Sequence, residues 1–476
     1  MRAVCDPGAV RATVSPPTPP APRHLRLVVS GTGDHDVAQL HDALAETLRG
    51  LPAGPGPTAV RGVQERVGAA GSPRTLLVPI GPRESSAVVR ADLAGRIDGV
   101  PERADIILRT SGSTTGTARL VAMSAAALVA SARATHARLG GPGTWVLALP
   151  AHHVAGLQVL VRSIVAGTRP VVVNTAGGFD PGALAAGAER ALGRGGPVYV
   201  SLVPTQLLRV LADPGAAAVL ARASAVLVGG AATDPALLAR SRAAGIRAVT
   251  TYGMSETGGG CVYDGLPLEG VSVRIEDPDE AGVGRIVLAG PVLAEGYVGP
   301  PGAPSRTAQT GRPAESARSA EPTWSAAFRT GPRELATADR GRLEALPDGS
   351  TRLTVLGRLD DIIVTGGIKV DPREVEQVLA GLPGVAQACV VGIPDATWGS
   401  AVVAAVVPEA GTAVDGEGLR RQARERLDGA HAPKRVLVVP EMPLRGPGKT
   451  DRRAVAALCR AMRGLPGPSE AVAARS

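Results

Sequence analysis

A glycine- and hydroxyl-rich segment, RTSGSTTGTARL at residues 109–120, has the residue types that bind an anion. Glycine adopts strained backbone dihedral angles, so several N–H groups of such a segment can point at one phosphate. The residues expected to bind phosphate are Thr110, Ser111, Gly112, Ser113, Thr114, Thr115 and Gly116. A flexible surface linker is the alternative, but the apolar run ADIIL precedes the segment, and LVAMSAAALVASA, expected to be a helix, follows it.

A second segment, TTYGMSETGGG at residues 250–260, combines an aromatic ring, a carboxylate and three consecutive glycines. Tyr252 could stack on a flat base, and Thr257 could bind a phosphate. Glu256 could hold Mg²⁺, which is bound through oxygen ligands. Taken alone, the segment is equally typical of a turn with a glutamate that faces solvent.

Two later segments are weaker signals. In ATADRGRL, residues 336–343, Asp339 could accept hydrogen bonds from ribose hydroxyls. The segment GRLDDIIVTGGIKVDPREVE, residues 357–376, contains Arg358, a pair of aspartates and a double glycine. By itself, that segment is more typical of a strand that ends in a surface turn.

Lys449 lies in PLRGPGKTDRR, residues 443–453, whose Gly-Lys-Thr core is like the end of a P-loop. A P-loop requires a glycine five residues before Gly448 and a strand that leads into a helix. Position 443 is proline, so the segment is not a P-loop. The alternatives are a lysine that a mobile loop delivers to a phosphate and a solvated lysine in a glycine-rich tail.

Short β-branched runs such as TWVLALP, PVYVSLVP and SAVLVGG alternate with Ala-rich stretches of helical length. This alternation predicts an α/β fold with mainly parallel sheets. Residues 1–24, rich in Pro, Ala and Arg, are expected to be a disordered tail. Residues 25–357 are expected to form a large domain, with a disordered insertion at 299–333 where aliphatic residues are scarce. Residues 358–476 predict a small α+β domain.

The bulk composition excludes one class of partner. The chain has 476 residues, which suits two or three domains, and a formal net charge of +8. Its arginines are scattered and only 2% of its residues are aromatic, so it lacks the stacking platforms of a nucleic-acid-binding protein. The positive charge fits anionic small substrates instead.

Four cysteines, Cys5, Cys261, Cys389 and Cys459, lie far apart and show no CxxC spacing. This argues against a zinc site or a disulfide framework and fits a reducing cytoplasm. The N-terminal segment has no apolar stretch of signal-peptide length, and no apolar run reaches membrane-spanning length. A soluble cytoplasmic protein without a membrane span is predicted, and none of these features predicts an oligomeric state.

Together, and in this order, the segments resemble the signature motifs of the adenylate-forming superfamily. That superfamily includes acyl- and aryl-CoA synthetases, luciferases and peptide-synthetase adenylation domains. TSGSTTGTAR resembles its phosphate loop, YGMSET its adenine and metal motif, and TADRG its ribose motif. GRLDDIIVTGG resembles the hinge motif and PLRGPGKTDR the C-terminal lysine motif.

The resemblance implies a large N-terminal AMP-binding domain and a small, mobile C-terminal domain. It implies that ATP converts a carboxylic acid to an acyl-adenylate and pyrophosphate, after which a thiol, normally that of coenzyme A, displaces AMP. Glu256 would hold Mg²⁺. The other implied ATP- or AMP-binding residues beyond the phosphate loop are Gly229, Gly230, Tyr252, Gly253, Thr257, Asp339 and Arg358.

By the same resemblance, Lys449 is the catalytic lysine of the small domain. It would bridge the acyl carboxylate and the α-phosphate in one orientation of that domain. The domain would then rotate about the hinge residue Asp360. This rotation would withdraw Lys449 and bring Gly366 and Gly367 up as a wall of the coenzyme A tunnel.

The sequence departs from the superfamily pattern in four ways. The phosphate loop carries one more residue than its commonest form. Arg119 stands where lysine is usual, and arginine keeps the charge but has a different donor geometry. Ala338 precedes Asp339 where glycine is commoner. The region before the phosphate loop is short, which implies a trimmed N-terminal subdomain.

The stretch LPAHHVAGLQVLVRSIVAGTRPVVV, residues 149–173, resembles the superfamily motif that lines the acyl pocket. With VSLVPTQLLRVL after it, the stretch is similar to compact actinobacterial o-succinylbenzoate–CoA ligases of menaquinone biosynthesis. His153 is the implied gate residue beside the reacting carboxylate. A helix-cap or surface position is the alternative. The His-His pair is not expected to bind a metal, because no third ligand lies at suitable spacing.

The implied acid carries a second carboxylate that stays charged, so its pocket needs a cation or donor. Arg162 is a candidate, but it follows His153 by two and a half helical turns, on the opposite face of a straight helix. A solvated helix arginine is the alternative. Asn174, Ser201 and Thr205 follow strand ends, where α/β sheets place ligands, and are further candidates.

The resulting hypothesis is ATP-dependent ligation of coenzyme A to 2-succinylbenzoate. The alternatives are another aryl- or acyl-CoA ligase and a stand-alone adenylation enzyme that loads a carrier protein, because all share the nucleotide motifs. A further hypothesis, from another class, is a degenerate member that binds nucleotide or a partner without turnover. The altered phosphate loop and the insertion are its only support.

Overall fold

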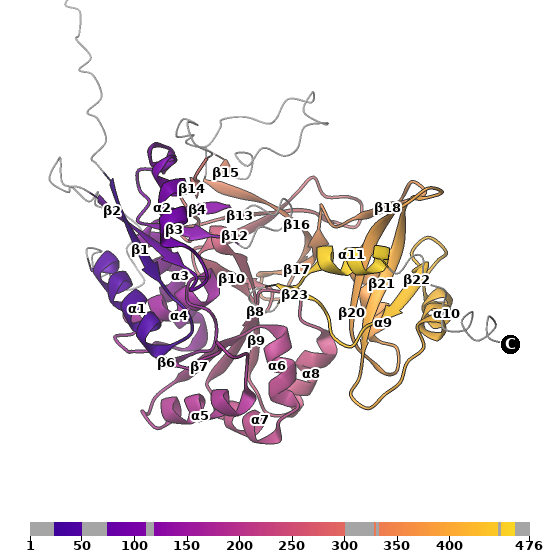
Figure 1. Ribbon diagram of the computed structural model, residues 1–476, viewed down its shortest axis with the longest axis horizontal. Coiled ribbons are helices and arrows are strands. Elements are labelled where there is room, and N and C mark those ends of the chain that lie inside the picture. The colour runs from indigo at the N-terminus through magenta and orange to yellow at the C-terminus, as the bar shows by residue number, and fades with distance from the viewer. Residues whose placement is uncertain are drawn as a thin grey trace, which may run out of the picture.

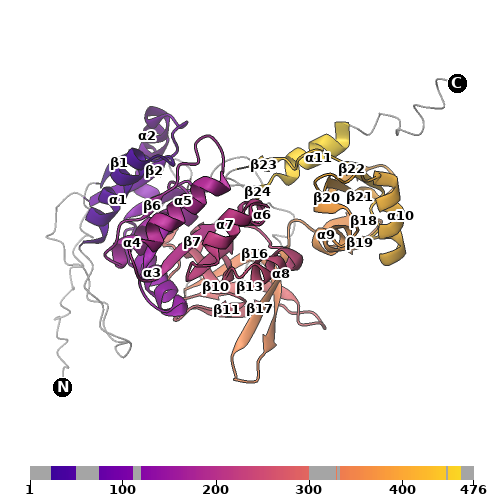
Figure 2. The same cartoon turned by 90° about the horizontal axis from the view of Figure 1, so that it is seen from below.

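Two bodies of unequal size meet along one side, a large one built from roughly the first 360 residues and a small one built from the rest (Figure 1, Figure 2). The computed structural model describes residues 23–49, 74–110, 119–299, 328–329, 333–445 and 449–461. An ion pair between Arg340 of the large body and Asp371 of the small one lies across the junction.

The first sheet of the large body is formed mainly by its N-terminal strands. Its members are β1 (Arg23–Val29), β2 (Arg74–Ile80), β3 (Ile106–Arg109), β4 (Leu120–Met123) and β14 (Gly296–Tyr297), paired in that order. Strands β1 to β3 are parallel, whereas β4 is antiparallel to both its neighbours. Its helical segments are α1 (Asp34–Leu48), α2 (Ser86–Ala94) and the 3-10 turn η1 (Ile97–Gly99). Because β3 and β4 are antiparallel neighbours, the glycine- and hydroxyl-rich segment is the loop that connects them.

The second sheet is the largest. Its strands are β5 (Thr144–Leu147), β6 (Val171–Val172), β7 (Val198–Leu202), β8 (Ala225–Gly229), β9 (Ala248–Met254), β10 (Gly259–Tyr263) and β11 (Leu266–Pro267). Strands β5 to β9 are parallel, which confirms the predicted α/β core. Its helices are α3 (Ala125–Leu139), α4 (Val154–Val165), α5 (Pro181–Leu192), α6 (Pro204–Leu211), α7 (Pro214–Leu220) and α8 (Pro235–Ala243). Side chains of α3 and α4 pack on one face and those of α5 to α8 on the other.

The third sheet is antiparallel throughout. Its strands are β12 (Ser272–Glu276), β13 (Gly284–Ala289), β15 (Phe328–Arg329), β16 (Glu334–Ala345) and β17 (Thr351–Arg358). Strands β16 and β17 form the hairpin predicted from the Asp-Gly turn, in which Gly349 has a φ of +83°. Figure 2 shows this hairpin projecting from the large body. The long β16 carries Asp339 to the edge of the second sheet.

The small body is the predicted α+β unit. Its strands are β18 (Ile363–Thr365), β19 (Ile368–Val370), β20 (Val385–Asp395), β21 (Gly399–Pro408), β22 (Arg435–Val438), β23 (Leu444–Arg445) and β24 (Lys449–Thr450). Its helices are α9 (Pro372–Ala380), α10 (Gly416–Arg426) and α11 (Arg452–Ala461). One core packs β20 and β21 against α9 and α10, and a second packs them against α11.

Four helices begin at an Asp-Pro dipeptide, which explains where they start. Asp180, Asp213, Asp234 and Asp371 cap α5, α7, α8 and α9, and each carboxylate accepts a main-chain N–H of the first turn. The proline that follows has a backbone dihedral suited to the first helical position and lacks an N–H that would need a partner there.

Three expectations about element boundaries were wrong. Strand β1 begins at Arg23, inside the segment expected to be a tail, because it pairs in parallel with β2. Residues 120–123 form β4 rather than the start of a helix, and the helix begins only after the cap Ser124. Strand β15 lies inside the expected insertion and pairs with β16. Residues 1–22 and most of the expected insertion lie outside the described residues.

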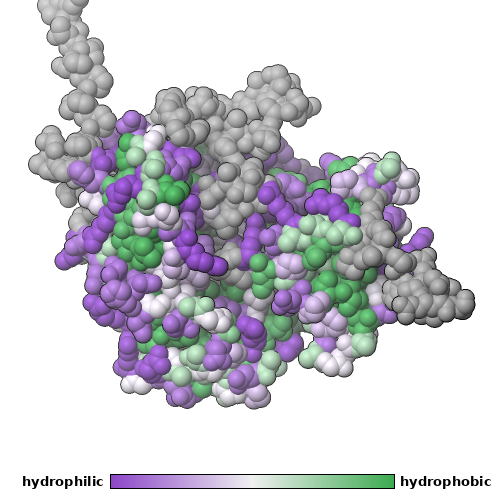
Figure 3. Space-filling view, in the orientation of Figure 1, coloured by the Kyte–Doolittle hydropathy of each residue, from purple (hydrophilic) through white to green (hydrophobic). Residues whose placement is uncertain are grey.

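Hydrophilic and hydrophobic residues are interspersed over the face of the molecule seen in Figure 3. Within the described ranges, none of the helices is both long enough and apolar enough to cross a membrane.

Candidate active site

The base of the expected phosphate loop is closed by main-chain and side-chain hydrogen bonds. Thr110 N donates to Arg119 O at 2.9 Å, and Thr110 Oγ1 accepts from Arg119 N at 3.1 Å. Of the expected phosphate-binding residues, Thr110 is described, whereas those from Ser111 to Gly116 lie outside the described residues. The chain therefore enters the expected loop from β3 and leaves it into β4, which pairs with β3 on one side and β14 on the other.

The second motif folds as a tight turn between β9 and β10. A Cβ on Gly253 would lie 2.1 Å from Gly259 O, so only glycine allows this approach of the two chains. Thr257, expected to bind a phosphate, is fully buried, and its hydroxyl donates to Gly259 O at 2.6 Å. Its hydroxyl thus fastens the turn. Ser255, half-buried beside Glu256, is a hydroxyl residue that the sequence reasoning missed, since nothing in the Ser-Glu-Thr triplet distinguishes the two hydroxyls.

Glu256 is held from both its side chain and its main chain. Tyr297 Oη donates to Glu256 Oε1 at 2.7 Å, and Ala294 N donates to Glu256 O at 2.7 Å. Glu256 as a whole is only 8% exposed. Sequence reasoning also missed Tyr297, because a Gly-Tyr dipeptide carries no signal of its own.

Tyr252 and Asp339, the expected base- and ribose-binding residues, are in contact. Tyr252 Oη donates to Asp339 Oδ2 at 2.8 Å, which joins β9 of the second sheet to β16 of the third. Burial and the neighbouring carboxylate hold the pKa of Tyr252 well above its ordinary value. Burial also raises the pKa of Asp339, against the Tyr252 hydrogen bond and the charge of Arg358. The structure therefore brings the two motifs together.

Arg358, at the end of β17, connects Asp339 to the hinge. Its Nη1 lies 3.7 Å from Asp339 Oδ1, and its Nε and Nη2 each donate to Asp360 at 2.7 Å. Although burial opposes it, the Asp360 and Asp339 carboxylates hold the pKa of Arg358 above its ordinary value. The expected nucleotide-binding arginine and the expected hinge residue are thus direct partners.

Lys449 reaches this site from the small body. Strands β23 and β24, which carry it, lie where the two bodies meet in both views (Figure 1, Figure 2). Gly230, after β8, has a φ of +83°, and a Cβ placed on it would lie 3.6 Å from Lys449 Cε. Burial, then the charges of Arg445 and Arg358, lower the pKa of Lys449, whereas Glu256 raises it. The lysine is therefore not a solvated tail residue.

His153 occupies the N-cap position of α4 without a side-chain capping hydrogen bond, and its ring packs at a 45° tilt against that of His152, with ring centroids 4.3 Å apart. Burial, followed by the charges of His152 and Lys449, lowers the pKa of His153 to about 4. The imidazole is therefore neutral at pH 7. His152 Nδ1 lies 2.7 Å from Ser30 O, so β1 anchors the histidine pair.

The remaining pocket candidates divide by exposure. Ser201 is 7% exposed, and its hydroxyl has no hydrogen-bond partner among the described residues. Thr205 is half-buried on α6, one turn beyond the end of β7. Asn174 is exposed, and its Oδ1 accepts from Thr32 Oγ1 at 3.1 Å.

Gly229, expected to bind the nucleotide, lies at the end of β8. A Cβ on Gly229 would lie 2.1 Å from the Thr251 hydroxyl, so the glycine allows close packing between β8 and β9.

Arg162 is not placed with the other pocket candidates. It lies about 13 Å along α4 from His153 at the usual rise per residue, and it is buried. Its guanidinium lies over the Trp145 ring, 4.9 Å from the ring centre, and Nη2 donates to Tyr263 Oη at 3.2 Å. These contacts bury the side chain in the core of the large body and exclude the alternative of a solvated helix arginine, whereas the role for the second carboxylate stays a prediction.

Gly366 and Gly367 form the turn between β18 and β19, with φ values of +56° and +82°. A Cβ on Gly366 would lie 2.9 Å from the Trp398 ring. Figure 1 and Figure 2 both place this hairpin on the small body, away from β23. In this orientation Lys449 is at the site and the glycine pair is not.

Within the described ranges, no group of three His, Cys, Asp or Glu side chains could hold a metal ion without other ligands. A single buried carboxylate fits Mg²⁺ instead, because that ion is usually bound by one or two carboxylates together with substrate phosphates and waters. Glu256 is such a carboxylate.

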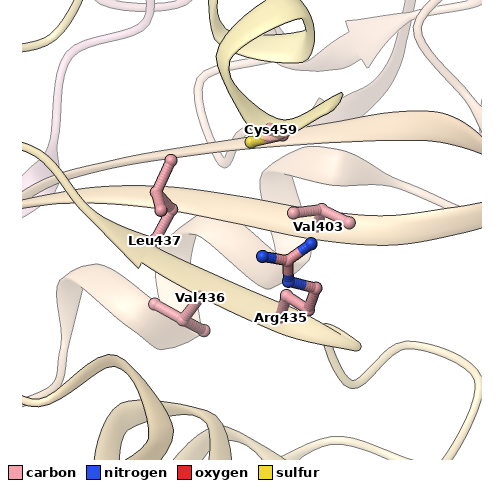
Figure 4. A pocket seen from close by; sticks show the side chains of 5 residues that line it. All are labelled: Val403, Arg435, Val436, Leu437 and Cys459. Atoms are coloured by element: carbon pink, nitrogen blue, oxygen red, sulfur yellow. The ribbon is translucent and has the colours of Figure 1, made fainter. Parts of the chain in front are cut away.

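A small cavity of the small body belongs to none of these motifs. It is lined by Val403, Arg435, Val436, Leu437 and Cys459, between β21, β22 and α11 (Figure 4). The chemistry-bearing residues therefore gather at the junction of the two bodies and not in this cavity.

Comparison with known proteins agrees with this arrangement. Models of the AMP-binding enzyme and of the AMP-binding enzyme C-terminal domain match residues 82–298 and 374–449. The "probable 2-succinylbenzoate–CoA ligase" of Mycobacterium tuberculosis is 45% identical over 351 residues, 74% of this chain and 83% of that protein. The 2-succinylbenzoate–CoA ligase of Enterococcus faecalis is 30% identical over 362 residues, 72% of this chain and 67% of that protein.

A solved structure of o-succinylbenzoate coenzyme A synthetase from Bacillus subtilis, in complex with ATP and magnesium ion, is also similar. It is 28% identical, with a TM-score of 0.57 over 74% of this chain and 69% of that one. The sequence resemblance, the two-body fold and these matches agree, and the chain belongs to the AMP-binding enzyme family.

Proposed function

We propose that this chain ligates coenzyme A to 2-succinylbenzoate at the expense of ATP. The observation that carries the proposal is the position of Lys449, which lies beside Gly230 and is affected by the charges of Glu256 and Asp339. The chain is also 45% identical to a probable 2-succinylbenzoate–CoA ligase. In the first half-reaction, a carboxylate oxygen of the acid attacks the α-phosphorus of ATP, and pyrophosphate leaves. In the second, the thiol of coenzyme A attacks the acyl carbonyl, and AMP leaves. The product would belong to menaquinone biosynthesis.

The large domain would bind the nucleotide. Tyr252 would stack on the adenine while its hydroxyl orients Asp339 toward the ribose, and Arg358 would contribute positive charge. Glu256 would hold Mg²⁺ together with phosphate oxygens, and the bound ion would neutralise phosphate charge during the first half-reaction. Ser255, next to Glu256, would supply a hydroxyl to the phosphates, because the Thr257 hydroxyl is already hydrogen-bonded to Gly259 O.

Lys449 would stabilise the negative charge that builds between the acyl carboxylate and the α-phosphate. Its burial supports this role, because a cation fixed in a water-poor site stabilises developing charge more than one in bulk water. The neutral His153, whose pKa is near 4, would border the reacting carboxylate without an ionic attraction to it. Ser201 and Thr205 would contact the rest of the acid.

The small domain would rotate between the half-reactions. We place the domain boundary at residues 358–360, with Asp360 as the hinge, since β17 ends at Arg358 and the core of the small body begins at Ile363. The separation of the Gly366 hairpin from Lys449 supports two orientations, one for each half-reaction. We also expect a cytoplasmic enzyme, since Cys261, Cys389 and Cys459 are free thiols.

A substrate panel tests the proposal. The full-length protein with ATP, Mg²⁺ and coenzyme A should convert 2-succinylbenzoate to its thioester, detected by mass, faster than benzoate, acetate or a medium-chain fatty acid. Preference for a fatty acid would favour the alternative of another acyl-CoA ligase. Adenylate formation followed by transfer to a carrier-protein thiol, with no transfer to coenzyme A, would favour a stand-alone adenylation enzyme.

A further inference from the structure

The segment 294–298 joins β4 to the turn that carries Glu256. Its Glu295 N and Val298 N donate to β4 at Ala122 O and Leu120 O, at 2.7 and 2.9 Å. This pairing fixes it to the strand that leaves the phosphate loop. Its opposite contacts are to the turn that carries Glu256. The segment therefore fixes the position of Glu256 relative to β4, the strand that follows the expected phosphate loop.

Tyr297 is the side chain through which this segment holds Glu256. Its hydroxyl donates to Oε1 at 2.7 Å, while Ala294 N donates to the carbonyl of the same residue at 2.7 Å. Two hydrogen bonds from one segment thus hold the glutamate at both its main chain and its carboxylate. One of the two carboxylate oxygens is taken by a neutral donor, and this orients the other.

The ring of Tyr297 is itself held in place. It packs edge-on against Phe328, with ring centroids 5.3 Å apart and planes at 62°. The Arg119 guanidinium carbon lies 5.7 Å from the ring centre on another side. The ring has little freedom to turn the hydroxyl away.

We propose that Tyr297 is a positioning residue that orients the Glu256 carboxylate for Mg²⁺ binding in the MgATP complex. This inference rests on the proposed function, because it takes Glu256 as a metal ligand. Groups that orient a metal-binding side chain change metal affinity by about 10- to 100-fold when they are removed. Arg119 supports the same ring, which gives the arginine found in place of the usual lysine a contact suited to its flat guanidinium.

The test is a titration of the full-length protein with Mn²⁺ in the presence of saturating α,β-methylene-ATP. Electron paramagnetic resonance monitors the binding of Mn²⁺. Tyr297→Phe keeps the ring and its packing and removes only the hydroxyl. We expect it to raise the Kd for Mn²⁺ by about tenfold or more. The Mg²⁺ concentration that gives half-maximal adenylate formation should rise by a similar factor, and saturating Mg²⁺ should restore kcat.

Tyr199→Phe is the matched control. Its buried hydroxyl donates to Gly141 O at 2.9 Å, away from the signature motifs, so its removal should leave the Kd for Mn²⁺ within about twofold of the wild type. Wild-type affinity in Tyr297→Phe, or equal weakening in both variants, would overturn the inference and leave the proposed function standing. A wild-type protein that binds no Mn²⁺ with the nucleotide would overturn the proposed function itself.

Discussion

Arg358 donates from Nε and Nη2 to the two carboxylate oxygens of Asp360, each at 2.7 Å. The two residues lie on either side of the point where the chain passes from β17 into the small body. The same guanidinium also faces Asp339, 3.7 Å away. A rotation about residue 360 would therefore change the ion pair of an arginine that also faces Asp339, the residue proposed to bind the ribose.

Asp360→Asn should slow adenylate formation more than thioester formation. The substitution removes one charge from the bidentate pair and weakens the orientation seen here by about 1 kcal/mol, since both groups are partly exposed. We expect a roughly three- to tenfold slower first half-reaction. Rapid-quench measurement of each half-reaction, the second with supplied adenylate, checks this. Asp361→Asn, whose carboxylate lies 3.7 Å from Arg452, is the control, and equal slowing of both half-reactions by Asp360→Asn would contradict the assignment.

Lys449→Ala should abolish adenylate formation and spare the thioester step. Loss of a fixed charge that stabilises a transition state reduces the rate by about 10²- to 10³-fold. Pyrophosphate exchange into ATP in the presence of the acid measures the first step, and AMP release from supplied adenylate with coenzyme A measures the second. Lys434→Ala, at an exposed lysine over the Trp398 ring, is the control for the first step. Similar losses in both steps would rule out two orientations.

The lysines themselves report the orientation. The chain has three, Lys369, Lys434 and Lys449, and all follow the hinge. The first two are exposed, whereas Lys449 is partly buried at the site. An amine-specific reagent followed by peptide mass analysis should modify Lys369 and Lys434 first. Addition of a stable adenylate analogue and coenzyme A should then speed modification of Lys449. An unchanged rate would argue against its withdrawal.

Ser201→Ala should weaken binding of the acid and leave ATP binding unchanged. The buried Ser201 hydroxyl has no partner among the described residues, so its removal should cost the fold little. Loss of one hydrogen bond to the substrate, about 1 kcal/mol, should raise the KM for the acid about fivefold. Ser131→Ala removes a similarly buried, unpaired hydroxyl from α3 and is the control. Steady-state kinetics that give the same KM in both variants would remove Ser201 from the pocket.

His136 should make the fold sensitive to acid. Burial and the neighbouring Arg162 lower the pKa of His136 to about 4, from 6.5 in the unfolded chain. Between these values the unfolded state binds the extra proton, so the free energy of unfolding should fall as the pH drops from 6.5 toward 4. At pH 5 this loss is about 2 kcal/mol for one histidine.

Urea unfolding at pH 7.5 and pH 5 measures this loss. The His136→Gln variant keeps an acceptor for Trp145 Nε1, which lies 3.4 Å from His136 Nε2, and should lose less stability between the two pH values than the wild type. An identical loss in both proteins would show that another group titrates.

The strand–helix alternation was predictable because β-branched runs and Ala-rich stretches differ in period along the chain. The Asp-Pro helix starts and the Asp-Gly hairpin are local chemistry and can be recognised in the sequence. Strand β4 was missed because four apolar residues before a capping serine also suit the start of a helix. Its strand conformation depends on pairing with two other strands. Of these, β3 lies on the other side of the expected phosphate loop, and β14 is distant in the chain.

Candidate site residues could be predicted where they belong to a recognisable sequence motif. They could not be predicted where their position depends on tertiary contacts. Lys449, Glu256, Tyr252 and Asp339 are placed near one another by elements far apart in sequence. Arg162 could not be assigned, because its place depends on Trp145 and Tyr263 of two different strands. Tyr297 was missed for the same reason, since its importance comes from one hydrogen bond across the fold.

Tyr252, Glu256 and Asp339 all precede residue 360, whereas Lys449 follows it. In the proposed mechanism, a swing of the small body would exchange a cation for a thiol-binding wall and leave the side chains around the adenosine in place. An acyl-adenylate is readily hydrolysed, and it would not need to change its contacts with the large body between its formation and its consumption. The labile intermediate would therefore stay bound to one set of residues throughout the domain rotation.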